Sequence, residues 1–430
     1  MNAATRPEEL LTLKAAYLMP CVYHFYRQPP VIVSGEGAFL ADSTGKRYLD
    51  CYSGVTVMSA GHGNTEILDV AITQLRRLQH TTTIYLTEPM LRLAERLAAI
   101  APGAIRRTFF CASGSEANET AMLLASLATG RHGIIALTDA LHGRTNWAMS
   151  VTGLDMWRTS SHLLEDVRFA PHPFCASCPL RASLPSCEYA CIARMETLIE
   201  EMGPENVAAV VAEPIQGNGG IIVPPEGYWQ RVRRLCDRYG ILLIFDEVQT
   251  AMNRTGRWFG SEHWDTIPDI VTMAKALGNG LPIAAVMATD AIAQAYTRPG
   301  AATFGANPVS CAAALATLEF HERERLGERA LRLGAEFREG LEQLARAWPC
   351  LTRVRGKGMM TGVDVVAGGG EADGARCDAV LELLKDLGFL AGKTGRDRNT
   401  LTFMPPLVVE AADLQRLLDA VNRAVRETKK

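Results

Sequence analysis

The sequence predicts an α/β protein whose large domain is built around a mainly parallel sheet. Along the middle of the chain, short and almost continuous apolar runs alternate with amphipathic stretches of helical period. Such runs are typical of parallel strands buried on both faces, and helices between the strands would cover those faces. We expect helices at residues 115–129 and 228–239, and strands at 107–111, 133–138, 207–213, 241–246, 270–273 and 284–288.

The two ends of the chain differ from this middle part. Residues 30–50 read as a small antiparallel meander with a turn at 42–45. The last hundred or so residues combine amphipathic helices with short strands. We therefore expect a large domain over residues 56–315, and a small α+β domain formed by residues 316–430 with help from residues 1–55.

The composition excludes several classes of protein. Of the 430 residues, 48% are apolar and 21% are charged, and the formal net charge is −3. This balance provides no basic surface for nucleic acid or an anionic membrane. No apolar run reaches the roughly 18 residues that span a bilayer, and the first residues lack the apolar core of a signal peptide. We expect a cytoplasmic protein that binds neither nucleic acid nor a membrane.

A first candidate site follows the strand that ends at residue 111. Ser113, Gly114 and Ser115 open a predicted helix, and Gly114 allows a sharp turn and the close approach of a ligand. Free N–H groups at the start of a helix attract phosphate. A plain helix cap would produce the same pattern, so this motif alone leaves both interpretations open.

Two further strands end in residues that can carry chemistry. Asp246 ends an apolar strand, and open α/β sheets bind ligands beyond the carboxyl ends of their strands. A buried carboxylate there would need a partner, but Asp246 could instead simply cap the next loop. Lys275 follows another strand; in an apolar site its pKa would fall and its amine would become nucleophilic, whereas an exposed lysine would only reach solvent. Together, a phosphate cradle, an acid and a lysine are what pyridoxal phosphate requires for its phosphate, its ring nitrogen and its aldehyde.

With these residues the chain resembles the class III aminotransferases, which have fold type I of the pyridoxal-phosphate enzymes. The resemblance covers nearly the whole chain, and the ordered set of motifs is far more specific than any single one. The matching segments are Ala60-Gly61-His62, residues 113–118, Leu141-His142-Gly143-Arg144-Thr145, Glu213-Pro214-Ile215-Gln216-Gly217, residues 246–249, Lys275, and residues 303–308.

The resemblance implies a seven-stranded type of sheet, a cofactor-binding large domain, and a homodimer or tetramer that shares its active sites between subunits. Lys275 would form the Schiff base with pyridoxal phosphate and later move the proton, while Asp246 would keep the ring nitrogen protonated. Thr303 would add a phosphate contact across the dimer interface. The other cofactor-binding positions would be Ser113, Gly114, Ser115, Leu141, His142, Glu213 and Gln249, the last near the phenolic oxygen.

Two positions depart from the family pattern. The residue before His142 is usually aromatic and stacks on the cofactor ring, but here it is Leu141, and whether His142 serves instead stays open. The arginine that commonly precedes the Pro-Pro segment and binds an α-carboxylate is replaced by Thr402. Glu213, which often pairs with that arginine in the family, is kept.

The missing arginine bears on the substrate. Arg144 is the best remaining anion binder in the motifs, although it could form a structural salt bridge, and Arg396 and Arg398 are nearby in sequence. We assign Arg144, Thr402 and Tyr52 to the substrate site.

The leading hypothesis is an aminotransferase that moves an amino group from a primary amine or ω-amino acid to a keto acid. Without this arginine, the chain also resembles a lyase side branch of the family. These phosphoethanolamine phospho-lyases and hydroxyaminoethylphosphonate ammonia-lyases eliminate a group from phosphorylated or phosphonate amines. A cofactor-binding module without activity is a third hypothesis, but the intact Lys275 and Asp246 argue against it. A dehydrogenase is disfavoured because no strand is followed by G-x-G-x-x-G.

Four of the eleven cysteines gather in a predicted insertion near residues 171–191 of the large domain. Their spacing could supply four thiolates to one structural zinc ion, but free cysteines also pack as small apolar groups. The four are Cys175, Cys178, Cys187 and Cys191.

Overall fold

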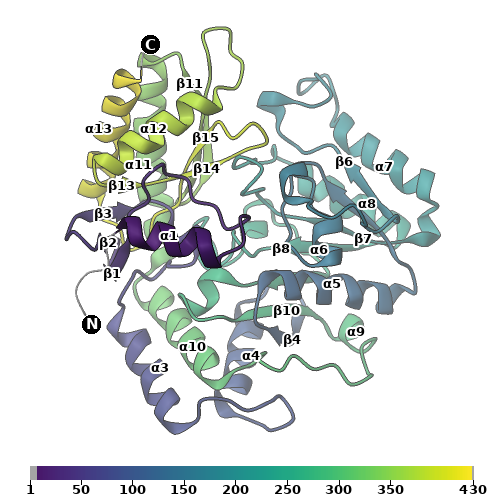
Figure 1. Cartoon of the computed structure of the whole chain (residues 1–430). Coiled ribbons are helices and arrows are strands. Elements are labelled where there is room, and N and C mark those ends of the chain that lie inside the picture. The colour runs from purple at the N-terminus through teal and green to yellow at the C-terminus, as the bar shows by residue number, and fades with distance from the viewer. Residues whose placement is uncertain (1–6, 429–430) are drawn as a thin grey trace.

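A mixed sheet of seven strands forms the centre of the larger part of the molecule (Figure 1). The structure is a computed structural model that describes residues 7–428. Across the sheet the strands are β4 (Ile105–Cys111), β10 (Ala284–Thr289), β9 (Ile270–Met273), β8 (Leu242–Asp246), β7 (Val207–Ala212), β5 (Gly133–Leu137) and β6 (Val167–Ala170).

The sheet is parallel except at β10, which is antiparallel to both of its neighbours, β9 and β4. The prediction of a mainly parallel sheet of seven strands is thus confirmed. Because β10 runs opposite to both of these neighbours, β4 points in the same direction as the parallel strands. The carboxyl ends of β4, β5, β7, β8 and β9 therefore meet at one edge of the sheet.

Helices cover both faces of the sheet because its central strands β5 and β7 are apolar and buried at every position. In β5, Ile134 and Ala136 pack into the core beneath α5 (Gly114–Thr129). Ile135 and Leu137 face the other way, into the core that includes residues of α4 (Glu88–Ile100), α7 (Ala190–Met202) and α8 (Tyr228–Tyr239). This two-sided burial explains why continuous apolar runs identified the strands.

The two ends of the chain meet in a second core. Tyr26 and Leu49 pack there with Leu417 and Val421. One sheet contains β1 (Ile32–Glu36), β2 (Phe39–Asp42), β3 (Arg47–Asp50) and β13 (Phe389–Leu390), and another contains β11 (Leu351–Lys357), β12 (Met360–Val365), β15 (Thr400–Phe403) and β14 (Gly392–Thr394). The helices of this part are α11 (Leu326–Ala347), α12 (Gly374–Asp386) and α13 (Ala411–Glu427).

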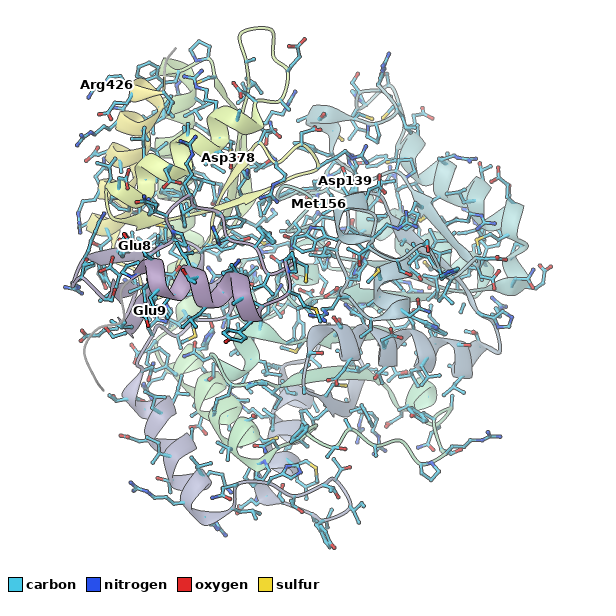
Figure 2. The ribbon with its side chains drawn as sticks, viewed as in Figure 1. Glu8, Glu9, Asp139, Met156, Asp378 and Arg426 are labelled. Atoms are coloured by element: carbon cyan, nitrogen blue, oxygen red, sulfur yellow. The ribbon has the colours of Figure 1, made fainter. Side chains whose placement is uncertain are left out.

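The predicted domain bounds stay a prediction, and the residues 1–6 and 429–430 that they include lie outside the described part of the chain. Asp139, which is labelled in Figure 2, follows β5 in the larger part of the molecule. Its carboxylate pairs with Arg396 from the loop between β14 and β15. The remaining helices are α1 (Pro7–Tyr17), α2 (Ser53–Thr56), α3 (Thr65–Arg77), α6 (Asn146–Ser150), α9 (Asp290–Ala293) and α10 (Pro308–Arg323). Over residues 7–428, none of the helices has the length and apolar character needed to cross a bilayer.

Candidate active site

A cavity of about 340 Å³ opens where the carboxyl ends of β4, β5, β7, β8 and β9 meet. This is the edge at which open α/β sheets bind ligands, and the volume lies within the range of small-molecule sites. Nine of the residues predicted from the sequence line this cavity: Ser113, Gly114, Ser115, Leu141, His142, Glu213, Asp246, Gln249 and Lys275.

The amino-terminal end of α5 faces the cavity with free backbone donors. Ser113 caps the helix: its hydroxyl accepts the N–H of Glu116, and the Glu116 carboxylate accepts the N–H of Ser113. Among residues 7–428, no acceptor is found for the N–H groups of Gly114 and Ser115, which both line the cavity. An anion placed here would satisfy both donors and interact favourably with the helix dipole.

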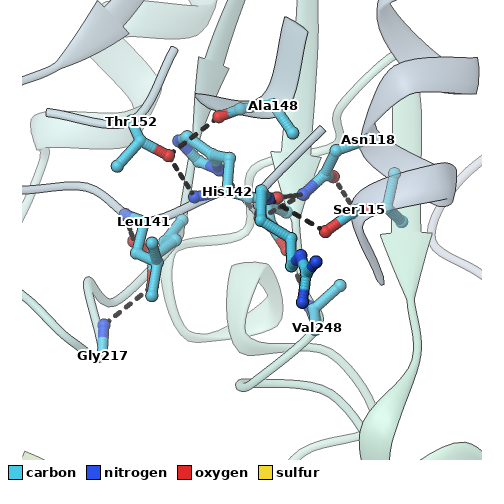
Figure 3. Close-up of polar contacts among 12 residues, drawn as sticks. Ser115, Asn118, Leu141, His142, Ala148, Thr152, Gly217 and Val248 are labelled. Carbon is cyan, nitrogen blue, oxygen red and sulfur yellow. Dashed lines mark hydrogen bonds and ion pairs between the residues drawn. The ribbon is translucent and has the colours of Figure 1, made fainter. Parts of the chain in front are cut away.

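Asp246 lies on the floor of the site and is held by three donors. Its Oδ2 accepts the side-chain amide of Asn118 at 2.7 Å and Nδ1 of His142 at 2.8 Å, and its Oδ1 accepts the N–H of Val248 at 3.0 Å (Figure 3). Thr272 in turn donates to Oδ1 of Asn118 at 2.8 Å. Burial lowers the pKa of His142, but the hydrogen bond and charge of Asp246 outweigh it and raise that pKa overall.

Sequence reasoning gave no role to Asn118 or Thr272. Asn118 lies one helical turn after Gly114, on the buried face of α5, whose other residues are apolar. A polar side chain on a buried helix face must find hydrogen-bond partners, so an asparagine at this position was the sequence signal for a role in the site.

Lys275 follows β9 directly and begins a short 3₁₀ turn over residues 275–278. Its φ of 44° is uncommon for a residue other than glycine, a strain typical of functional sites. Burial lowers the pKa of Lys275 to about 8, although Asp246 and Glu213 act in the opposite direction. At neutral to mildly alkaline pH, a substantial fraction of the Lys275 side chains is therefore neutral, and a neutral amine is nucleophilic.

Glu213 is a buried carboxylate on the cavity wall. It accepts the N–H of Leu141 at 3.0 Å and the N–H of Gly217 at 2.8 Å. Burial raises the pKa of Glu213 to about 7. In the described part of the chain no lysine or arginine forms an ion pair with it.

Four other predicted site residues lie away from the cavity lining. Arg144 is exposed, and its backbone N–H donates to the Ser115 hydroxyl at 3.1 Å. Thr303 is also exposed. Thr402 is fully buried in β15, and Tyr52 is half-buried.

The other two arginines near Thr402 in sequence are engaged. Arg396 pairs with Asp139, and the guanidinium of Arg398 lies over the rings of Tyr23 and Phe25. Neither one lines the cavity.

The structure does not support the predicted zinc site. The four cysteines surround one small apolar cavity, but across residues 7–428 no three or more cysteine, histidine or acidic side chains converge as metal ligands do. The alternative interpretation, packing as small apolar groups, fits this arrangement. The four are Cys175, Cys178, Cys187 and Cys191.

The cavity fits pyridoxal phosphate. Two free N–H groups at the start of α5 suit a phosphate, the buried carboxylate of Asp246 suits a protonated ring nitrogen, and the amine of Lys275 suits an aldehyde. The buried Nε2 of His142 has no partner in the described chain, so this part of the cavity wall leaves a polar atom unsatisfied.

The amino-acid sequence was compared with protein families and with known proteins. The family model of aminotransferase class-III matches residues 24–425. The acetylornithine aminotransferase of Methanothermobacter thermautotrophicus is 36% identical over 422 residues, which cover 98% of this chain and 99% of that protein.

Solved structures agree as well. An amine transaminase from an uncultivated Pseudomonas species, in its pyridoxal-phosphate-bound form, superposes with a TM-score of 0.89 at 30% identity, covering 96% of this chain and 98% of that one. A phospholyase from Arthrobacter in complex with phosphoethanolamine superposes with a TM-score of 0.90 at 31% identity, covering 97% and 99%. The chain therefore belongs to the class-III aminotransferases and is a pyridoxal-phosphate-dependent aminotransferase of fold type I.

Proposed function

We propose that this aminotransferase moves the amino group of a primary amine or ω-amino acid to a keto acid, with Lys275 as the residue that bonds covalently to the cofactor. The observation that carries the proposal is one cavity that holds a half-buried lysine of lowered pKa, a buried carboxylate and a helix start with free donors. No arginine takes the position where the family commonly binds an α-carboxylate, which favours amines over α-amino acids.

Pyridoxal phosphate supplies an aldehyde that condenses with amines and a pyridine ring that accepts electron density. In the proposed roles, the N–H groups of Gly114 and Ser115 bind its phosphate, and Asp246 holds the ring nitrogen protonated. His142 and Asn118 orient the Asp246 carboxylate through their hydrogen bonds. The amine of Lys275 removes the proton from the carbon that bears the substrate's amino group, which its pKa of about 8 permits.

Around the ring, Leu141 would cover one face of the cofactor by dispersion, without aromatic stacking. Gln249, also on the cavity wall, would lie near the phenolic oxygen. Both assignments rest on the positions of these side chains in the cavity and on the family resemblance.

We further propose that the active unit is at least a homodimer in which Thr303 reaches the phosphate site of the partner subunit. Thr303 is exposed and does not line the cavity of its own chain. The neighbouring Phe304 is 65% exposed, and Ile84 and Leu86 expose 80% and 79% of their surface, which is typical of an apolar contact face.

The direct test is to supply the holoenzyme with an amine and pyruvate or 2-oxoglutarate, and to measure the amino acid formed. Transamination predicts that the amine is consumed only when a keto acid is present, with one amino acid formed for each amine lost. Consumption of the amine without a keto acid, together with release of ammonia or phosphate, would contradict it.

That second result would instead support the lyase hypothesis, which two observations favour: Thr402 in place of the arginine, and the structural similarity to the phospholyase from Arthrobacter. In that case the exposed Arg144, beside the Ser115 hydroxyl, is the proposed receiver of the substrate's phosphate or phosphonate. Arg144→Ala should then raise the KM for an anionic amine and leave that for a neutral amine nearly unchanged.

A further inference from the structure

Asp139 lies in the loop after β5, two residues before Leu141, and that loop goes on to form part of the wall of the active-site cavity with Leu141 and His142. The φ of Asp139 is 62°, in the left-handed region that side chains other than glycine seldom adopt. Such a backbone persists where the surrounding contacts hold it. The carboxylate is buried, so the groups bound to it help to hold this turn.

The Asp139 carboxylate joins three loops. Its Oδ1 accepts a hydrogen bond from Nε of Arg396 at 2.9 Å, and Arg396 lies between β14 and β15 in the part formed by the two chain ends, here called the smaller part. Its Oδ2 lies 3.3 Å from Nε2 of His172, in the loop after β6. Burial lowers the pKa of His172, which favours the neutral ring. Nδ1 of that ring accepts the N–H of Phe174 at 3.3 Å, so its proton is on Nε2, facing Asp139.

The backbone around Asp139 is packed as closely as its side chain. A Cβ at Gly219 would lie 2.5 Å from the carbonyl oxygen of Asp139, so a glycine is needed where the loop after β7 meets this turn. The neighbouring carbonyl of Asn218 accepts the N–H of Gly395 at 2.9 Å. The loop that carries Arg396 therefore rests on the larger part both by its backbone and by its guanidinium.

A second cavity, of about 350 Å³, lies beside these contacts and shares no lining residue with the active-site cavity. Charged side chains from both parts of the molecule line it, among them Asp139, Arg353, Arg355, Asp364 and Arg396. A polar interface of this kind allows two parts to move relative to each other more readily than an apolar one does.

Two arginines of the smaller part cross this interface. Arg355 donates to the carbonyl of Gly220 at 2.8 Å, in the loop after β7. Arg396 pairs with Asp139, and the side chains of these two residues are 62% and 8% exposed. Of the two contacts, the pair with Asp139 is the one that ends on the loop of Leu141 and His142.

We infer that Asp139 is a positioning residue: through its pair with Arg396, docking of the smaller part fixes the loop that places Leu141 and His142 against pyridoxal phosphate. This inference rests on the proposed positions of Leu141 and His142 beside the cofactor. Without the pair, less holds the left-handed turn, so the loop gains other conformations and the cofactor is bound less tightly.

The first test is a double-mutant cycle of Asp139→Asn, Arg396→Ala and the combined variant, read as the affinity for pyridoxal phosphate. Asparagine has the size of aspartate and tolerates the left-handed backbone, so this substitution removes mainly the charge. Because Arg396 is largely exposed, each single variant should weaken cofactor binding only about three- to tenfold. The combined variant should bind about as well as the weaker single variant, because both substitutions break the same contact.

The matched control is Arg353→Ala. Arg353 lines the same cavity and is exposed, but its guanidinium lies 3.3 Å from Asp364 of β12, so that pair lies within the smaller part. Its loss should leave cofactor affinity unchanged. Arg396→Lys keeps the cation and should bind the cofactor more tightly than Arg396→Met, which has a similar length and no charge.

Hydrogen exchange of the cofactor-free protein gives a readout that depends neither on the cofactor nor on turnover. The N–H groups of Leu141, His142 and Arg144 are hydrogen-bonded, so their exchange reports on opening of the loop. It should be faster in Asp139→Asn and in Arg396→Ala, with no further gain in the combined variant. A general loss of stability would instead raise exchange throughout, the buried strands β7 and β8 included.

Unchanged cofactor affinity in both single variants would overturn the inference, and so would effects that multiply in the combined variant. A change confined to Arg396→Ala would also overturn it, because Arg396 would then act without Asp139. Failure of the proposed function looks different, since the wild type would then transfer no amino group from an amine to a keto acid. Cofactor affinity and hydrogen exchange still decide the role of Asp139 in that case.

Discussion

The position of Lys275 among carboxylates sets the chemistry at the scale of single residues. Its half-buried side chain lines the cavity at the end of β9, and burial favours the neutral form over the ammonium ion. Asp246 accepts hydrogen bonds from three donors and, in the proposed roles, lies opposite the ring nitrogen of the cofactor. In the proposed roles, Lys275 thus supplies the nucleophilic amine and Asp246 the partner of the ring nitrogen.

The lowered pKa of Lys275 predicts a pH dependence of stability in the cofactor-free protein. Between pH 8 and 10.5 the unfolded chain keeps a proton that the folded chain has lost, so the free energy of unfolding rises with pH across this window. The gain is up to about 3 kcal/mol. Denaturant unfolding of the wild type minus that of Lys275→Met should show this rise, and a flat difference would mean that the amine is not desolvated.

Asp246→Asn should reduce turnover far more than stability. An amide cannot hold a protonated ring nitrogen, and loss of one such preorganised contact costs about a hundredfold or more in kcat. The measurements are kcat and the thermal midpoint of the same variant. Near-wild-type turnover would show that another acid serves the ring.

The sequence identified Asp246 and Lys275 because a polar residue at the end of an apolar strand is a recognisable pattern. It could not identify Asn118 or Thr272 as partners of Asp246, because they are distant in sequence and meet only through the packing of α5 on the sheet. Whether the four clustered cysteines converge was likewise beyond the sequence, because spacing along a loop does not determine it; among residues 7–428, no three metal-ligating side chains converge.

At the scale of elements, the start of α5 depends on how closely a second loop approaches it. Gly143 has a φ of 143°, and a Cβ there would lie 2.4 Å from the Ser115 hydroxyl. This contact fixes the helix start against the loop that carries Leu141 and His142. A side chain at residue 143 would displace Ser115 from the proposed phosphate position.

Gly143→Ala should therefore weaken binding of pyridoxal phosphate about tenfold or more, as expected for the loss of a charge-assisted hydrogen bond. Fluorescence titration of the cofactor-free protein measures this. Gly130→Ala is the matched control, because Gly130 ends the same helix with a φ of 70° and has nothing within 4 Å of the added Cβ. It should cost stability through its left-handed backbone and leave cofactor affinity unchanged; equal affinities for both variants would contradict this account.

Elements with two-sided burial were predictable, whereas one of the two edge strands of the large sheet, β6, was not. Strand β9 and helix α8 have the predicted bounds, and β5 and β8 differ by one residue. Strand β6 was missed because it lies at the sheet edge, where exposed Arg168 interrupts the apolar pattern. The antiparallel direction of β10 was also not predicted, since an apolar run carries no information on strand direction.

At the scale of the whole molecule, the proposed sharing of active sites predicts complementation between two inactive or weakened variants. In a mixed dimer of Thr303→Ala and Lys275→Ala chains, the site that keeps Lys275 receives an intact Thr303 from the other chain. Refolded or co-expressed mixtures should thus contain one site of wild-type cofactor affinity per mixed dimer. If Thr303 serves its own chain, mixing restores nothing.

The central claim is that Lys275 is the residue that bonds to pyridoxal phosphate, and one measurement tests it most directly. The holoenzyme is reduced with borohydride, digested, and its peptides are mapped by mass spectrometry. We predict that the reduced cofactor is found on the peptide containing Lys275, and that Lys275→Ala folds but retains no reducible cofactor. A cofactor mass on any other lysine of the wild-type protein would contradict the assignment.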